Sequence, residues 1–363
     1  MLQTLRTIKN YLSSIPAFYQ YIYTQRESLT KDKAVYFIIR KNPYKRYLYT
    51  LIKFFDLSGY TVYIKKDLAL FQTLKNETYT TFLLKERIIY FGVPSPEANP
   101  VTIDEQILSP NYFNRPISDV LRNHSYYVPM SQHPLMYYTG WWKQPIEKVK
   151  RKRSLFMAGN FNAADYGAIQ TDRLFNVMSR LEVYACLDDK KLLFPIGSLS
   201  DIVLFLQQDI DHQIILVDRL LVDIPMQELR NLLGKFDFYF ALSGVVIPFS
   251  HNIIEAMSVG CIPFMQEEYA KMFSPALVNG KQVITFKNSE DLEERIAYLF
   301  TLNETEIAQL RDEVNRYYEN YLTPSAVVAK IEENSFETIY LQAEHYSVAL
   351  INKASSGSAG STI

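Results

Sequence analysis

The chain has 363 residues, a net charge of −1, and a composition of 48% hydrophobic and 21% charged residues. This length predicts about two domains, each with its own core. The hydrophobic content excludes an intrinsically disordered chain, and the charge balance gives no sign of a nucleic-acid partner. Two widely separated cysteines exclude a disulfide framework and a cysteine metal site.

The first part of the chain alternates apolar strands with amphipathic helices. After an amphipathic opening helix at residues 2–12, buried strands are expected at 34–39, 61–64 and 86–92. A helix between the first two strands ends at Gly59, and its apolar face is marked by Leu48, Leu51, Ile52 and Phe55. No GxGxxG motif follows the first strand, so a dinucleotide fingerprint is absent.

Residues 93–150 are rich in proline and aromatic residues, which predicts irregular structure. After the basic run KVKRKR the alternation resumes. Strands are expected at 154–158, 182–186, 213–217, 238–242 and 261–264, and helices at 170–181, 199–208, 226–235, 250–259, 289–301, 304–320 and 324–349. The predicted fold class is therefore α/β, with two Rossmann-like, doubly wound domains at residues 1–145 and 146–323.

The most informative motif is FDFYFALSGVVIPFSHNIIEAMSVGCIPF, residues 236–264. It predicts a strand, a loop and a short helix whose first turn carries Ser250, His251 and Asn252. Free backbone N–H groups and the helix dipole favour an anion such as phosphate at that position. Glu255 shares a helical face with His251, and its carboxylate suits the two hydroxyls of a ribose. A nucleotide would satisfy both ends of this face.

The segment EAMSVGCIPF resembles the late signature of glycosyltransferases of the GT-B architecture, and its GCIP ending resembles the exostosin-like branch. The resemblance implies an active site in the cleft between the two domains. It also implies that Glu255 binds the donor ribose and that Ser250, His251 and Asn252 face the donor phosphates. Ile247 stands where many retaining members carry a second glutamate, so the stereochemical outcome stays open.

The same resemblance implies that the end of the chain returns to the first domain. A helix over residues 324–350 is expected to make this crossing. Residues 351–363, which include SSGSAGST, are expected to form a flexible tail.

The loop at 158–167, AGNFNAADYG, follows the first strand of the second domain. Gly159 allows a ligand close to the backbone, and Asn160 can donate to a phosphate or sugar. The resemblance implies that this loop faces the donor phosphates, whereas an ordinary turn is the alternative. Arg173 is a candidate countercharge for phosphate, with a solvated surface arginine as its alternative.

Asp218 is a candidate catalytic residue because it ends the expected strand at 213–217, at the edge where parallel sheets bind ligands. It would act as a nucleophile or stabilise the reacting sugar; the alternative is an ion pair with Arg219. The resemblance places the nucleotide base near Pro225 and Met226.

There are two weaker candidates. His133, in Gln132-His133-Pro134 between the domains, is a candidate general base, and Glu97 is the carboxylate of the first domain expected to face the cleft. A structural role in a proline-rich turn is the alternative for His133. His251 and Glu255 have the spacing of a metal-binding pair, but no third ligand follows, so neither a metal nor a cofactor is expected.

Nine Lys and Arg against two Asp at residues 31–66 favour contact with an anionic acceptor or the inner-membrane surface, with an ordinary solvated face as the alternative. The sequence shows neither a signal peptide nor a membrane-spanning run, which predicts a cytoplasmic protein.

The predicted function is transfer of a sugar from a nucleotide-sugar donor to a hydroxyl of a glycan or glycolipid acceptor, without a metal. UDP, GDP and CMP donors all stay open. The resemblance implies a setting in bacterial surface polysaccharide assembly, such as lipopolysaccharide or capsule. The alternatives are a sugar-nucleotide epimerase or phosphorylase of the same architecture, and a non-catalytic sugar-binding protein.

Overall fold

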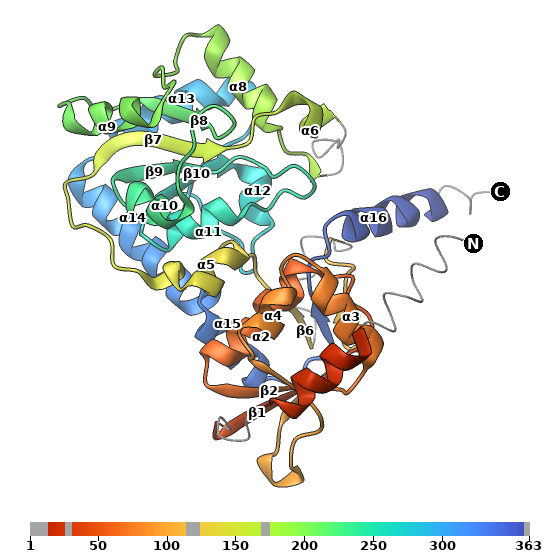
Figure 1. Ribbon diagram of the computed structural model, residues 1–363. Coiled ribbons are helices and arrows are strands. Elements are labelled where there is room, and N and C mark those ends of the chain that lie inside the picture. Colours follow the sequence, from red (N-terminus) through yellow and green to blue (C-terminus); the bar gives the residue numbers. More distant parts are fainter. Residues whose placement is uncertain (1–13, 26–30, 114–123, 168–174, 359–363) are drawn as a thin grey trace. The chain divides into compact units, whose positions relative to one another are not determined.

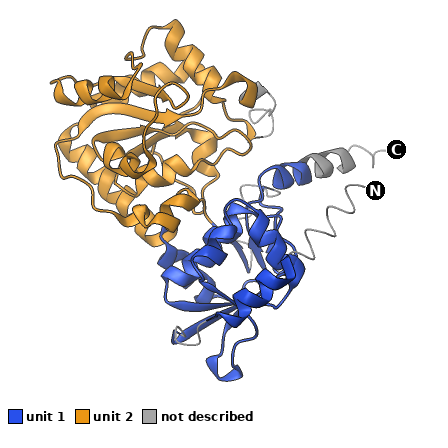
Figure 2. Ribbon diagram, in the orientation of Figure 1, with its two compact units in different colours: residues 1–128, 323–363 blue, residues 129–322 orange. Residues whose placement is uncertain are grey.

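The computed structural model describes residues 14–25, 31–113, 124–167 and 175–358 (Figure 1). The chain forms two α/β units: unit 1 combines residues 1–128 with 323–363, and unit 2 contains residues 129–322 (Figure 2). The division after residue 128 precedes the predicted boundary after 145, because segment 129–144 bonds to helices of unit 2. For example, the backbone N–H of His133 donates to the carboxylate of Glu255. The opening helix expected at 2–12 lies outside the described residues.

Unit 1 is built on a parallel four-stranded sheet in the order β3–β2–β1–β4. Its strands are β1 (Lys33–Ile38), β2 (Tyr60–Ile64), β3 (Ile89–Phe91) and β4 (Val101–Asp104). The first three confirm expected strands, whereas β4 falls in the segment expected to be irregular. Its sequence, VTID, is too short and mixed to signal a strand, and only its pairing with β1 establishes it.

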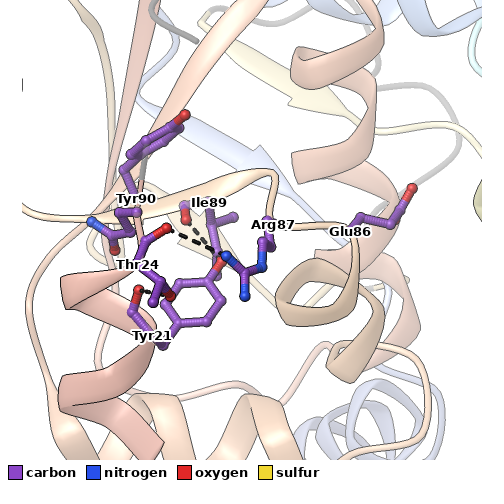
Figure 3. Close-up of a pocket in the computed structure, with 7 residues that line it drawn as sticks. Tyr21, Thr24, Glu86, Arg87, Ile89 and Tyr90 are labelled. Atoms are coloured by element: carbon purple, nitrogen blue, oxygen red, sulfur yellow. Dashed lines mark hydrogen bonds between the residues drawn. The ribbon is translucent and has the colours of Figure 1, made fainter. Parts of the chain in front are cut away.

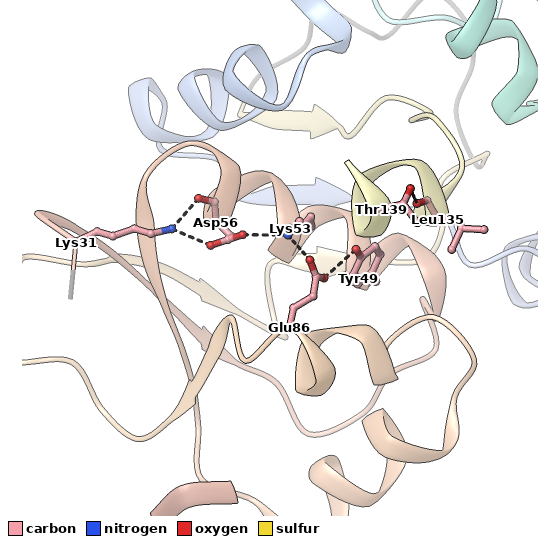
Figure 4. A network of polar contacts seen from close by, with 7 residues as sticks. All are labelled: Lys31, Tyr49, Lys53, Asp56, Glu86, Leu135 and Thr139. Atoms are coloured by element: carbon pink, nitrogen blue, oxygen red, sulfur yellow. Dashed lines mark hydrogen bonds and ion pairs between the residues drawn. The ribbon is translucent and has the colours of Figure 1, made fainter. Parts of the chain in front are cut away.

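The helices of unit 1 are a helix at residues 14–23, α2 (Arg46–Leu57), α3 (Leu68–Asn76), α4 (Thr81–Lys85), the 3-10 turn η2 (Pro96–Ala98), α15 (Pro324–Glu333) and α16 (His345–Ser358). The predicted apolar face of α2 is buried, and Gly59 follows it with φ of +87°. Beside this face, Lys53 Nζ lies 2.5 Å from Glu86 Oε1 and 3.2 Å from Asp56 Oδ2 (Figure 4). The hydroxyl of Tyr49 also donates to Glu86, at 3.1 Å.

The prediction of one continuous helix over 324–350 is wrong. Helix α15 begins with Thr323 as its N-cap and ends at Glu333, and Asn334 has extended backbone angles. The following residues form β12 (Thr338–Tyr340), which pairs in parallel with β5 (Leu108–Ser109) and β6 (Ser125–Tyr127). Because these partner strands lie more than 200 residues earlier in the chain, no periodic pattern in the local sequence predicts β12. The expected tail at 351–363 is also wrong in part, since α16 continues to Ser358.

Unit 2 is built on a parallel five-stranded sheet in the order β11–β10–β9–β7–β8. The strands are β7 (Lys152–Gly159), β8 (Ile214–Asp218), β9 (Phe236–Phe240), β10 (Ile262–Gln266) and β11 (Ile284–Phe286). Four confirm expected strands, and β11 was not anticipated. Their aromatic side chains form the core: Phe156 stacks on Phe236 with ring centroids 4.5 Å apart. Burial of each such side chain contributes roughly 2–3 kcal/mol.

Helices lie on both faces of this sheet (Figure 1), as in a doubly wound fold. They are α5 (Pro134–Thr139), η4 (Trp141–Lys143), α6 (Ala163–Gly167), α8 (Arg180–Asp189), α9 (Leu199–Gln207), α10 (Met226–Leu233), α11 (His251–Met257), α12 (Glu267–Lys271), α13 (Ser289–Thr301), α14 (Glu304–Tyr317) and the π-helical turn Tyr318–Leu322.

The strand expected at 182–186 is wrong, because those residues belong to α8. Ser179 and Glu182 form a reciprocal capping box that begins this helix. The helix expected at 170–181 is wrong over residues 176–179, which are not helical. Residues 175 and 180–181 are helical, and 168–174 lie outside the described residues.

Candidate functional site

The order of strands locates a ligand crevice in unit 2. From β7 the chain crosses to β8 on one side, and it then returns to β9 on the other side of β7. The connections that leave β7 and β9 therefore diverge, and open parallel sheets bind ligands beyond the carboxyl ends of such neighbours. At this edge the structure brings together the end of β7 at Gly159–Asn160, Ser243 after β9, and Ser250 at the start of α11.

A buried arginine joins these segments. Arg180, the first residue of α8, is only 5% exposed. Its Nε donates to the carbonyl oxygen of Ser243 at 2.8 Å, and its Nη1 donates to that of Asn160 at 3.2 Å. Its Nη2 lies 3.4 Å from the hydroxyl oxygen of Ser250. A guanidinium is thus held at the point where the fold predicts an anionic ligand.

The close approach of Arg180 explains the glycine at the end of β7. A Cβ atom on Gly159 would lie 2.5 Å from Arg180 Nη1 and 2.6 Å from the methyl carbon of Met157. Gly159 was predicted to let a ligand approach the backbone, and in the structure it admits the guanidinium. Sequence reasoning selected Arg173, outside the described residues, and missed Arg180. The Ser-x-x-Glu capping box at 179–182 was the available signal for a helix beginning with this arginine.

Ser250 takes the expected N-cap position of α11, but its side chain caps no helical N–H. Its own N–H donates to the hydroxyl of Tyr269 at 3.1 Å. The Asn252 side chain is also engaged, since Nδ2 donates to the carbonyl oxygen of Ala158 at 2.7 Å. These bonds tie α11 to β7 and to α12. The phosphate roles of Ser250 and Asn252 stay predictions.

His251 is held in a defined tautomer. Its Nδ1 lies 2.8 Å from the carbonyl oxygen of Ser131, which can only accept, so Nδ1 carries the proton. Nε2 is therefore the proton-accepting nitrogen of the neutral ring. The ring of His133 packs edge-on against the ring of His251, with ring centroids 5.3 Å apart. His133 is also the N-cap of α5, and its Nδ1 accepts from the N–H of Leu135. His133 thus has the structural role named as its alternative.

Glu255 is fully buried on the same helix. Its Oε1 accepts from the N–H of His133 at 3.0 Å, whereas its Oε2 has no hydrogen-bond partner among the described residues. Burial raises the pKa of this carboxyl to about 7, although the His133 bond and the nearby Arg219 and Arg230 oppose the shift. The side-chain oxygen of the adjacent Gln132 is another buried acceptor without a partner in the described ranges. The ribose role of Glu255 stays a prediction.

Asp218 ends β8 beside the crevice, as expected, but the structure corrects its alternative role. Its Oδ1 accepts from the N–H of Leu220 at 3.0 Å, and no ion pair with Arg219 occurs among the described residues. The Arg219 guanidinium instead donates to the carbonyl oxygen of Ile224, while its backbone N–H bonds to Gly159. Asp218 therefore shapes a turn and presents a half-buried carboxylate.

The remaining candidates lie in several places. The Asn160 side chain bonds to Asp165 and to the N–H of Asn162, which organises the loop after β7. Pro225 is the N-cap of α10, and Met226 is its first residue. Glu97 is an exposed residue of η2 in unit 1.

Within the described ranges, no three His, Cys, Asp or Glu side chains are grouped to hold a metal ion. The same residues include no helix with the length and hydropathy to cross a membrane.

No family model and no curated protein sequence matches the chain. Among solved structures, the chain is similar to crystal structures of Anabaena Alr3699/HepE. The complex with UDP is 12% identical with a TM-score of 0.38, and the complex with UDP-glucose is 13% identical with a TM-score of 0.37. Each match covers 83% of this chain and 98% of the other chain.

Proposed function

We propose that the protein is a glycosyltransferase of the GT-B architecture, which transfers a sugar from a nucleotide-sugar donor to a hydroxyl of a glycan acceptor. The observation that carries the proposal is the guanidinium of Arg180, buried at the switch point between β7 and β9. A fixed, partly desolvated positive charge suits the phosphate of such a donor. The resemblance of EAMSVGCIPF to the GT-B signature supports the same reaction.

In this reaction the acceptor oxygen forms a bond to the anomeric carbon while the bond between that carbon and the phosphate oxygen breaks. The bonding electrons leave with the phosphate, and the proton of the acceptor hydroxyl passes to solvent water. Arg180 would stabilise the negative charge that develops on the phosphate. No metal is needed for that task, so we expect activity to survive EDTA.

His251 would assist at the same phosphate. The Ser131 carbonyl bound to Nδ1 stabilises the protonated ring, which can then donate from Nε2 to the leaving oxygen. Asp218 would act on the sugar in one of two ways. It stabilises positive charge at the anomeric carbon during this single displacement, or its carboxylate oxygen first displaces the phosphate and the acceptor oxygen then displaces the carboxylate.

Glu255 would bind the donor ribose. Its Oε2 is a buried acceptor without a donor among the described residues, an arrangement that costs about 1–3 kcal/mol. A ribose hydroxyl would supply that donor. Glu255 is fully buried, and segment 131–133 bonds to it and to His251, so we expect this segment to move when a ribose binds.

The proposed setting is bacterial surface polysaccharide assembly in the cytoplasm, with peripheral contact to the inner membrane through residues 31–66. The acceptor would be a glycan or a glycolipid.

Thermal-shift measurements with UDP, GDP and CMP test the proposal. We expect one nucleotide to raise the unfolding midpoint of the wild-type protein and to lose that effect in Arg180→Gln. The matched control is Arg40→Gln, which removes an exposed arginine from unit 1. If all three nucleotides leave the midpoint unchanged at millimolar concentration, the proposal is wrong.

Product analysis then distinguishes transfer from related chemistry. With the bound nucleotide's sugar donor, transfer requires an added acceptor. An epimerase would convert the donor without one, and a phosphorylase would require inorganic phosphate.

A further inference from the structure

Unit 1 contains a cavity that the proposed reaction does not use. It has a volume of about 420 Å³ and is lined by Tyr21, Thr24, Gln25, Arg87, Ile89 and Tyr90 (Figure 3). Ile89 begins β3, so the cavity lies at the amino end of this strand. Ligand crevices of parallel sheets lie at the carboxyl ends instead. The volume falls within the roughly 300–1,000 Å³ of small-molecule sites.

The hydrogen bonds of the lining residues show which polar groups remain for a ligand. The side-chain oxygen of Gln25 accepts from the N–H of Phe91 at 2.8 Å, so its NH₂ group is left to donate. The hydroxyl of Tyr21 donates to the carbonyl oxygen of Ile89 at 3.0 Å. The hydroxyl of Thr24 donates to the carbonyl oxygen of Gln20 at 2.8 Å.

Arg87 adds a positive charge to these donors. Its Nη1 donates to the carbonyl oxygen of Thr24 at 3.3 Å, which uses one of its five N–H groups. Within the described ranges, Arg87 makes no ion pair. Glu86 also lines the cavity, but its carboxylate is bonded to Lys53 and Tyr49, and in Figure 3 it points away from Arg87. The N–H groups that remain for a ligand in this cavity are therefore those of the Gln25 amide and the Arg87 guanidinium.

The backbone of Arg87 gives a second, independent observation. Its φ of +57° is in the left-handed region, directly after α4 ends. Helices commonly place glycine or asparagine there, and other residues incur about 1–2 kcal/mol. Glycine would therefore suit this backbone better than arginine. Arg87 therefore has a backbone conformation that is unfavourable for its residue type, and such conformations are common at ligand sites.

We propose that this cavity binds an acidic saccharide, that is, a sugar ring carrying a carboxylate or a phosphate. The guanidinium of Arg87 would bind the oxyanion in bidentate geometry. The Gln25 amide would donate to a neighbouring sugar oxygen, and the rings of Tyr21 and Tyr90 would cover the apolar face of the sugar. The site lies within unit 1 and does not depend on the donor site of unit 2.

Ligand-observed NMR titrations of the full-length protein test the ligand class. The probes are glucuronate, glucose 6-phosphate, glucose and inorganic phosphate. We expect at least one acidic sugar to bind ten times more tightly than glucose and inorganic phosphate, and the comparison of the two acids identifies the carboxylate or the phosphate as the preferred group. Equal binding of glucose would refute the anionic character, and equal binding of inorganic phosphate would refute the saccharide.

Three variants test the residues. Gln25→Glu keeps the oxygen that accepts from Phe91 but replaces the donor with a second carboxylate oxygen, so it should weaken acidic-sugar binding at least tenfold. Arg87→Gly should weaken binding equally while the unfolding midpoint stays the same or rises. The control Lys85→Gln removes a neighbouring exposed charge outside the cavity and should change neither.

Unchanged affinity in Gln25→Glu or Arg87→Gly would overturn the proposal. A fall of several degrees in the midpoint of Arg87→Gly with binding retained would assign Arg87 a structural role instead. Nucleotide affinity should be the same in all three variants, so failure here is distinguishable from failure of the proposed donor site.

Discussion

The two parallel sheets each have a switch point, but the charges at these points differ. In unit 2 the guanidinium of Arg180 is buried between the connections that leave β7 and β9. In unit 1 the corresponding neighbours are β1 and β4, where Glu105 accepts from the backbone N–H of Arg40 and the Arg40 side chain is exposed. A similar strand arrangement therefore presents a buried guanidinium in one unit and a carboxylate beside an exposed arginine in the other. The buried guanidinium suits a phosphate better.

A half-buried carboxylate of unit 1 and a fully buried one of unit 2 differ in their hydrogen bonding. Glu86 of unit 1 is bonded to Lys53 and Tyr49. Glu255 of unit 2 has one oxygen without a hydrogen-bond partner among the described residues. An acid with its partners in place serves stability, whereas an incompletely satisfied one is more typical of a ligand site.

The largest expected effect comes from Arg180→Gln, paired with Arg40→Gln in unit 1. Loss of the buried guanidinium should lower turnover by a factor of about 100 or more, equivalent to about 2.7 kcal/mol, and should abolish nucleotide binding. Arg40→Gln should leave nucleotide affinity unchanged. Calorimetric titration with the stabilising nucleotide and initial rates measure both effects. Wild-type affinity in a folded Arg180→Gln protein would remove the distinction between the two switch points.

Asp218→Asn should lower turnover by a similar factor of about 100 while nucleotide affinity is retained. Asparagine keeps the oxygen that accepts from Leu220, so the turn should persist and only the negative charge is lost. Rates at saturating donor, together with calorimetric affinity, separate the two effects. Mass spectrometry of the enzyme with donor alone would reveal a covalent sugar on Asp218 if it is the nucleophile. Near-normal turnover would leave Asp218 as a turn residue.

Gly159→Ala should weaken nucleotide binding about tenfold, because the new methyl group would displace the Arg180 guanidinium. Gly92→Ala in unit 1 is its matched control, since nothing lies within 4 Å of a Cβ atom there. Calorimetry of both variants provides the comparison. Equal affinities would show that the position of the guanidinium is not critical.

The smallest effect concerns pH and stability. Glu255 has a pKa of about 7 when folded and an ordinary value of 4.5, so the folded state holds the proton more tightly. Stability should therefore fall as pH rises from about 4.5 to 7, by at most about 3 kcal/mol. Thermal unfolding between pH 5 and 8 should show a smaller loss in Glu255→Gln than in the wild type.

Glu86→Gln provides the contrast from unit 1. It removes the negative charge that pairs with the buried Lys53 ammonium and should destabilise the protein at both ends of this pH range. Parallel pH profiles of Glu255→Gln and the wild type would contradict the buried, titrating acid in unit 2.

The sequence by itself determined the elements whose residues carry a local pattern. The apolar runs at β1, β7 and β9 and the amphipathic face of α2 were predictable, because periodic burial of side chains specifies both the element and the face that packs. The turn that delivers Ser250 and His251 to α11 was predictable for the same reason. Predictions failed where an apolar run that suggests a strand overlapped a capping motif that begins a helix. The apolar residues of LEVYAC indicated a strand, but the capping box of Ser179 and Glu182 starts a helix there.

Tertiary structure alone decided the features that join distant segments. Strand β12 exists through pairing with β5 and β6, and β4 through pairing with β1. Arg180 enters the candidate site only because β7 and β9 become neighbours, which places its guanidinium against carbonyl oxygens from two connections. The burial of Glu255 likewise depends on a segment more than a hundred residues earlier in the chain. Such contacts leave no periodicity in the sequence, because their free energy is gained only after the sheet has assembled.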